Sequence, residues 1–271
     1  MAKRIAWFTD VHFETLTREA VQEYLETNAT RRFDVALLGG DIGKGPSTYR
    51  YLEMAMQIWK RPIYFVLGNH DFYVSSLQAT HENMSVWSKA RTNAHYLPAH
   101  APVEVEPGCV LLGQNGWGDA RVGSPETSKA RMNDWVYIEE FAGLGSTARI
   151  ALLKRLGDQA AAALEVQIVN VLEKYSSIIL LTHVPPFEVT CADKEDGAPY
   201  YCCVAMGDVI RKLMKGRADK RMLILSGHVH CTSHQQVLPN VLQLTADAKY
   251  TGPCPPTEFE VSDAIFEQGL E

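Results

Sequence analysis

The feature that most constrains the fold is a series of short apolar runs, each bounded by residues that are typical of turns. Runs this short and this continuously apolar are typical of strands buried on both faces, as in parallel sheets covered by helices. Their alternation with helix-like segments predicts an α/β fold. The runs are residues 5–8, 35–38, 63–67, 110–112, 178–181 and 222–225.

Apolar residues recur at helical spacing between the first three runs. Residues 15–30 carry one such pattern, and residues 47–60 carry another, in which the apolar positions fall at i, i+3, i+4 and i+7. The spacing therefore predicts two consecutive βαβ units. Further predicted elements are a helix over 147–175 interrupted at Gly157, a helix over 206–216, and a hairpin from 233–238 and 241–245.

The organisation along the chain favours one domain over residues 1–271, because we find neither an internal repeat nor a linker rich in Gly, Pro or Ser. Two segments, 115–135 and 185–201, lack a regular pattern. Long loops in such folds are usually functional rims or mobile surface segments.

Polar side chains follow five of the predicted strands at the point where each strand ends. In an open parallel sheet, ligands bind outside the carboxyl ends of the strands, so we expect these groups to converge on one crevice. Five of the nine histidines fall in these segments. The segments are Asp10-Val11-His12, Gly39-Gly40-Asp41, Gly68-Asn69-His70-Asp71, His183 and Gly227-His228-Val229-His230.

Each segment alone has an ordinary structural interpretation, since glycines permit turns and an aspartate can cap a helix. Packing does not explain why imidazoles and carboxylates gather at strand ends, and metal binding does. Mixed Asp, His and Asn ligands suit Mn, Fe, Zn or Co. The number of candidate ligands exceeds what one catalytic ion uses and predicts two divalent ions, an arrangement that serves displacement at phosphorus.

The five segments, in this order, resemble the motifs of the calcineurin-like metallophosphoesterases: D-x-H, GD, GNH(D/E), a strand-end His, and GHxH. The resemblance implies an α/β fold, a four-layer αββα sandwich of two mostly mixed β-sheets flanked by helices, with a dinuclear metal site at its edge. It implies that one ion is bound by Asp10, His12, Asp41 and His230, and the other by Asp41, Asn69, His183 and His228, so that Asp41 bridges them.

The resemblance also implies a mechanism, in which a hydroxide that bridges the two ions attacks phosphorus. His70 would contact the phosphate or protonate the leaving oxygen. For Asp71, the next residue, two roles stay open: it orients His70, or it caps the helix that follows.

Departures from the family motifs narrow the substrate. Protein phosphatases of this superfamily extend the second motif to GDxxDRG and place Arg before GNHE, whereas this chain has Ile42-Gly43-Lys44-Gly45-Pro46 and Leu67 at those places. We therefore expect a hydrolase of a small phosphoester. The alternatives are specifically a cyclic-nucleotide phosphodiesterase, a hydrolase that retains one ion, and a metal-binding scaffold without turnover.

The charge balance agrees with a small substrate. The chain carries 26 Lys and Arg against 32 Asp and Glu, a net charge of −6, which disfavours binding to nucleic acid polymers or anionic membranes. Two divalent ions against Asp10 and Asp41 would reverse the sign locally. Without a recognisable signal peptide or apolar span, we expect a cytoplasmic protein, and we expect its six cysteines to be reduced.

Overall fold

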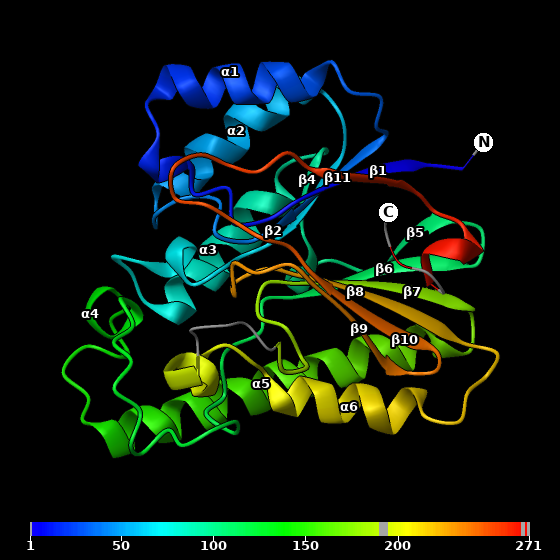
Figure 1. Cartoon of the computed structure of the whole chain (residues 1–271). Helices are drawn as coiled ribbons and strands as arrows, with labels where there is room; N and C mark the ends of the chain where they lie inside the picture. The colour runs from blue at the N-terminus through cyan, green and yellow to red at the C-terminus, as the bar shows by residue number, and fades with distance from the viewer. Residues whose placement is uncertain (1, 190–194, 267–268, 270–271) are drawn as a thin grey trace.

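The computed structural model describes residues 2–189, 195–266 and 269, and their main feature is a pair of stacked β-sheets with helices on both outer faces (Figure 1). The first sheet has the strand order β11-β1-β2-β3-β4. Neighbours from β1 to β4 are parallel, and β11 is antiparallel to β1. Its strands are β1 (Arg4–Phe8), β2 (Val35–Gly39), β3 (Ile63–Val66), β4 (Ala94–Tyr96) and β11 (Thr257–Glu260).

The second sheet has the order β5-β6-β7-β8-β10-β9, with a parallel centre and an antiparallel strand at each edge. Its strands are β5 (Val103–Glu106), β6 (Cys109–Gln114), β7 (Ser177–Thr182), β8 (Arg221–Ser226), β9 (Ser233–Leu238) and β10 (Val241–Thr245). Both sheets are therefore mixed, as the sequence resemblance implies.

Helices complete the layers above and below the sheets (Figure 1). α1 (Arg18–Ala29), α2 (Ser47–Trp59) and α3 (Leu77–Lys89) pack on the first sheet, whereas α5 (Ser146–Leu172) and α6 (Val204–Met214) pack on the second. The short α4 (Asp134–Tyr137) lies in the connection that leads to α5. The fold is thus the expected four-layer αββα sandwich.

Strand alternation explains why the sheet strands read as continuous apolar runs. In β1, Ala6 and Phe8 face the helices, while Ile5 and Trp7 face the other sheet. In β7, Ile178 and Leu180 face α5 and α6, while Ile179 and Leu181 face the first sheet. Because both faces of these central strands are covered, a polar side chain there is buried and needs a hydrogen-bond partner, as Gln243 on β10 has in the backbone of Phe187.

Two expectations need correction. Gly157 does not interrupt α5, which is one continuous helix; the glycine instead makes room for Asp119, since a Cβ at that position would collide with the Asp119 side chain. Cys231 is disulfide-bonded, so the expectation of six reduced cysteines is wrong, because cysteines far apart in sequence meet only through the fold. Cys109, Cys202, Cys203 and Cys254 are free, and Cys191 lies outside the described residues.

Candidate metal centre

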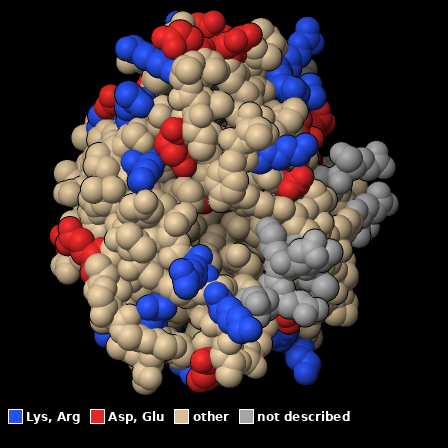
Figure 2. Space-filling model, turned by 60° about the vertical axis from the view of Figure 1, so that its left-hand side comes forward, with Lys and Arg blue, Asp and Glu red and all other residues tan. Residues whose placement is uncertain are grey.

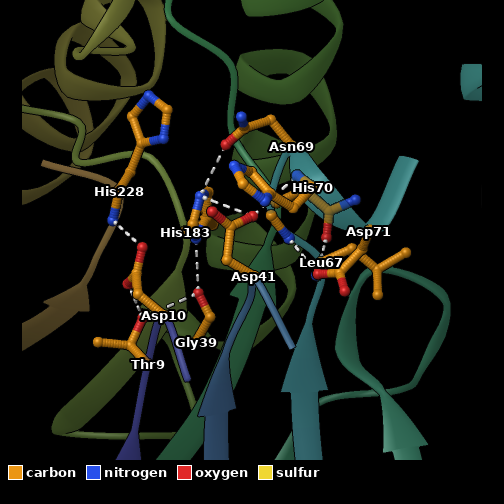
Figure 3. A network of polar contacts seen from close by, with 12 residues as sticks. Thr9, Asp10, Gly39, Asp41, Leu67, Asn69, His70, Asp71, His183 and His228 are labelled. Atoms are coloured by element: carbon orange, nitrogen blue, oxygen red, sulfur yellow. Dashed lines mark hydrogen bonds and ion pairs between the residues drawn. The ribbon is translucent and has the colours of Figure 1, made fainter. Parts of the chain in front are cut away.

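The predicted site residues lie together at the carboxyl ends of strands from both sheets. Figure 3 shows six of them, namely Asp10, Asp41, Asn69, His70, His183 and His228. β1, β2 and β3 of the first sheet position five of them, and β7 and β8 of the second sheet position three. From the first sheet these are Asp10, His12, Asp41, Asn69 and His70, and from the second His183, His228 and His230.

The first cluster consists of Asp10, His12, Asp41 and His230, each of which offers one ligand atom within 4.8 Å of those of the others. His230 Nε2 lies 3.2 Å from Asp10 Oδ1 and 3.2 Å from His12 Nε2. Carboxylate oxygens and imidazole nitrogens at this spacing form a donor set for a borderline divalent cation.

The second cluster surrounds His183. Its Nε2 lies 3.2 Å from Asn69 Oδ1 and 3.5 Å from Asp41 Oδ1. The His228 ring stands edge-on to the His183 ring, with centroids 4.9 Å apart. Burial and the neighbouring His183 lower the pKa of His228 to about 3, so its ring is neutral at pH 7 and keeps a nitrogen lone pair.

Asp41 faces both clusters. Its Oδ2 lies 3.7 Å from His12 Nε2, and its Oδ1 lies 3.5 Å from His183 Nε2. The backbone N–H of His70 donates to Oδ1 at 2.9 Å and holds the carboxylate in this orientation (Figure 3). Each oxygen of one carboxylate is thus directed to a different cluster, which is the geometry that a bridging ligand requires.

Protein acceptors hold the outward nitrogens of these side chains. His183 Nδ1 donates to Gly39 O at 2.9 Å, and His228 Nε2 donates to Tyr200 O at 3.1 Å. The amide nitrogen of Asn69 donates to Asp134 Oδ1 at 2.8 Å. Backbone carbonyls and carboxylates accept only, so the opposite atoms, His183 Nε2 and Asn69 Oδ1, are acceptors directed at one another.

Acceptor atoms that face one another across about 3 Å repel unless a cation or a proton lies between them. Metal-bound histidines almost always donate their other ring nitrogen to a carboxylate or a backbone carbonyl, as His183 and His228 do here. The donor set therefore fits two divalent cations.

The backbone at the site is strained. Five of the cluster residues have φ between 43° and 66°, a left-handed conformation that non-glycine residues rarely adopt. Such strain costs on the order of 1–3 kcal/mol for each residue and concentrates at functional sites. The residues are Asp10, His12, Asp41, His228 and His230.

Two glycines of the motifs make room for the carboxylates. A Cβ at Gly68 would collide with Asp41, and a Cβ at Gly227 would collide with Asp10. These glycines allow the backbone to lie close to the two carboxylates. From the sequence they were interpreted only as turn residues.

His70 lies beside the first cluster, and its ring centroid is 4.6 Å from that of His12. Its Nδ1 is 3.0 Å from Glu14 Oε1. Burial acts to lower the pKa of His70, but the charges of Asp41 and Glu14 and the hydrogen bond to Glu14 raise it to about 9.

Neither role considered for Asp71 is the one that it has. Its carboxylate accepts hydrogen bonds from the N–H groups of Ile42, Gly43 and Gly68 and from the Thr48 hydroxyl, at 2.6–3.1 Å. Asp71 thus ties the loop after β3 to the loop after β2 and to α2.

A cavity of about 280 Å³ opens onto the clusters. Its lining includes Asp41, Asn69, His70, His228 and His230 from the site, and Arg131, Asn133, Tyr73, Tyr201 and Tyr250 around them. Within the described part of the chain, Arg131 forms no ion pair or hydrogen bond and is the only Lys or Arg in this lining. Arg131 could not be predicted as a site residue, because nothing in the sequence pattern of residues 115–135 relates them to the site.

Lys and Arg are interspersed with acidic and neutral residues on the face drawn in Figure 2, without a continuous basic track. None of the helices among the described residues is long and apolar enough to span a membrane.

Comparison with known proteins agrees with the fold and identifies the family. The family model described as calcineurin-like phosphoesterase matches residues 3–232, and the chain belongs to this family of metal-dependent phosphoester hydrolases, which hold a dimetal site. No curated protein matches the sequence.

Solved structures share the fold at low sequence identity. Phosphopantetheinyl hydrolase from Mycobacterium tuberculosis is 12% identical, with a TM-score of 0.66 over 91% of this chain and 90% of that one. A dimetal phosphatase from Danio rerio is 12% identical, with a TM-score of 0.59 over 97% and 93%. GAP50, the anchor in the inner membrane complex of Plasmodium, is 13% identical, with a TM-score of 0.50 over 92% and 72%.

Proposed function

We propose that the protein hydrolyses a small, polar phosphoester with two divalent cations bound at this centre. The observation that carries the proposal is the pair of acceptor clusters joined by Asp41. In the second cluster, the ring nitrogens of His183 and His228 that point away from the site donate to backbone carbonyls. The first ion would be bound by Asp10, His12, Asp41 and His230, and the second by Asp41, Asn69, His183 and His228.

Bound divalent cations supply Lewis-acid stabilisation of negative charge at phosphorus and make hydroxide available at neutral pH. The protein's own residues orient the substrate and move the proton. His70 lines the cavity and is held at Nδ1 by Glu14, so its Nε2 is the atom available to protonate a leaving oxygen.

The cavity supports a small and polar substrate. Its volume of about 280 Å³ is near the lower end of ordinary ligand sites, and most of its lining side chains carry a polar group. Arg131, which has no ion-pair partner among the described residues, provides a cation suited to a phosphate oxygen. The three tyrosine rings allow a base to stack, which keeps a cyclic nucleotide among the candidate substrates.

The test uses purified protein loaded with Mn, Fe, Zn or Co and a panel of p-nitrophenyl phosphate, bis-p-nitrophenyl phosphate, cyclic nucleotides and polar phosphomonoesters. We expect metal-dependent turnover of at least one of them, and loss of that turnover in Asp41→Asn. Asp208→Asn, a change of an exposed aspartate on α6, is the matched control. Turnover by Asp41→Asn at the wild-type rate would overturn the proposal.

A scaffold without turnover is the second candidate. The likeness to GAP50 favours it, because that protein is described as an anchor. A scaffold would bind two equivalents of metal and cleave none of the panel, whereas the proposed enzyme both binds and cleaves. Binding of one equivalent with full activity would indicate a mononuclear hydrolase instead.

A further inference from the structure

One carboxylate connects a predicted metal ligand with the predicted proton donor. Glu14 lies in the 3₁₀ turn Phe13–Thr15, directly after the loop that carries His12. Its Oε1 is 3.2 Å from His12 Nδ1 and 3.0 Å from His70 Nδ1. Two histidines from the ends of β1 and β3 therefore share a single oxygen atom.

The shared oxygen fixes the protonation of both rings. An ionised carboxylate can only accept, so each Nδ1 carries the hydrogen and each Nε2 faces away from Glu14. His12 Nε2 is thereby left as an acceptor 3.7 Å from Asp41 Oδ2, inside the first cluster. His70 Nε2 is left at the other end of a ring that lines the cavity.

The contacts with His12 and His70 are the main interactions that compensate for the burial of the Glu14 carboxylate. The side chain is 15% exposed, and its second oxygen is buried and meets no hydrogen-bond partner among the residues that the structure describes. In the described part of the chain, the only ion pairs of Glu14 are with His12 and His70. Two imidazole N–H groups directed at Oε1 stabilise the carboxylate as an anion.

We infer that Glu14 is a positioning residue shared by the metal centre and the proton donor: it sets the tautomer and ring orientation of His12 and His70 together. This inference rests on the proposed function. It gives Glu14 the role that adjacency in sequence first suggested for Asp71, whose oxygens are occupied by backbone N–H groups and Thr48.

The first test needs no turnover. We would measure ¹⁵N chemical shifts of the histidine side chains in metal-free and Zn²⁺-loaded protein, together with Zn²⁺ affinity by titration calorimetry. The wild type should keep Nδ1 of His12 and of His70 protonated, so that at high pH, where Nε2 of His70 has lost its proton, each ring is a single Nδ1–H tautomer. Glu14→Ala should lose the single tautomer of His70 and bind Zn²⁺ about 10- to 100-fold more weakly, the usual effect of removing a group that orients a ligand. Glu14→Gln, which keeps the shape and a neutral acceptor, should be intermediate.

The second test separates positioning from a general structural effect. Phenyl phosphate has a poorer leaving group than p-nitrophenyl phosphate and depends more on a proton donor. Under saturating metal, Glu14→Ala should lower kcat about tenfold more for phenyl phosphate than for p-nitrophenyl phosphate. In a His70→Ala background, adding Glu14→Ala should lower kcat equally for phenyl phosphate and for p-nitrophenyl phosphate.

Glu23→Gln, a change of an exposed glutamate on α1, is the matched control and should behave as the wild type in every measurement. Equal kcat losses for both esters, or wild-type tautomers and Zn²⁺ affinity in Glu14→Ala, would overturn the inference. If the wild type cleaves no ester of the panel, the proposed function fails, while the tautomer and Zn²⁺ measurements still decide the role of Glu14.

Discussion

The side-chain amide of Asn69 donates a 2.8 Å hydrogen bond to Asp134, which lies 65 positions further along the chain. Asp134 also accepts from the Tyr73 hydroxyl at 2.8 Å. With its nitrogen held there, Asn69 directs its carbonyl oxygen to His183, 3.2 Å away. The irregular segment before α5 therefore supports the metal centre from outside.

Removing this support should weaken the second metal position. In Asp134→Ala the Asn69 amide and the Tyr73 hydroxyl lose a buried acceptor, which costs about 1–3 kcal/mol for each unsatisfied group. We expect the metal content to fall from two equivalents to about one at micromolar metal, measured by elemental analysis after gel filtration.

The control for Asp134→Ala is Glu139→Ala, a change of an exposed side chain nearby. Two equivalents retained by Asp134→Ala at wild-type affinity would show that Asn69 needs no such anchor.

Arg131 should act on substrate binding and not on the chemical step. Because this cation lines the cavity, Arg131→Gln should raise KM about tenfold or more and change kcat by less than about threefold. The rise in KM should be larger for dianionic monoesters than for monoanionic diesters. Steady-state kinetics on both ester types measures this, with Arg155→Gln on α5 as the control. An unchanged KM in Arg131→Gln would remove Arg131 from the substrate site.

His70 should make the stability of the metal-free protein depend on pH. Its pKa is about 9 in the folded protein and near 6.5 when unfolded, so its favourable contribution is complete below pH 6.5 and disappears as the pH rises through 9. The full shift corresponds to at most about 3.5 kcal/mol. Urea unfolding in EDTA should show the free energy of unfolding decreasing from pH 6 to 9.5 more steeply in the wild type than in His70→Gln. If the free energy of unfolding decreased equally in both proteins, His70 would not be the source of the pH dependence.

Gly227 should tolerate no side chain. A Cβ there would collide with the Asp10 carboxylate, which also accepts the His228 N–H at 2.9 Å. Gly227→Ala should therefore displace Asp10, lower the free energy of unfolding by about 1–3 kcal/mol and weaken metal binding. Gly145→Ala is a suitable comparison, because its Cβ would meet nothing within 4 Å and its φ of −70° suits alanine. Metal affinity unchanged in Gly227→Ala would argue against the close approach.

The sequence allowed the centre of the fold and the predicted ligands to be located, for one physical reason. Strands covered on both faces are largely apolar, so the first polar residues after each run mark a strand end, as at Thr9-Asp10 and at Asp41. Some elements were not predicted: β4 has only three residues and β11 four, and α3 was missed although it carries as many apolar side chains as α1.

The partners of the predicted ligands could not be found in this way. Asp134 reaches Asn69 from 65 positions away, and Glu14 reaches His70 from 56. Such contacts depend on how loops return to the sheet edge, and neither periodicity nor a motif records that path. Glu14 did have a local signal, since it lies two residues after His12, but the same spacing is common on a surface turn.

The two sheets supply the candidate ligands in nearly equal measure, and this division affects the mechanics of the whole molecule. Between the strand ends, the sheets meet through the apolar layer that contains Trp7, Leu37, Leu181 and Leu225. Ions bound by Asp10 and His230, or by Asn69 and His183, would cross-link one sheet to the other at its rim. Metal loading should then merge the sheets into one cooperative unit, and amide hydrogen exchange near the ends of β1, β3, β7 and β8 should slow together when metal is added.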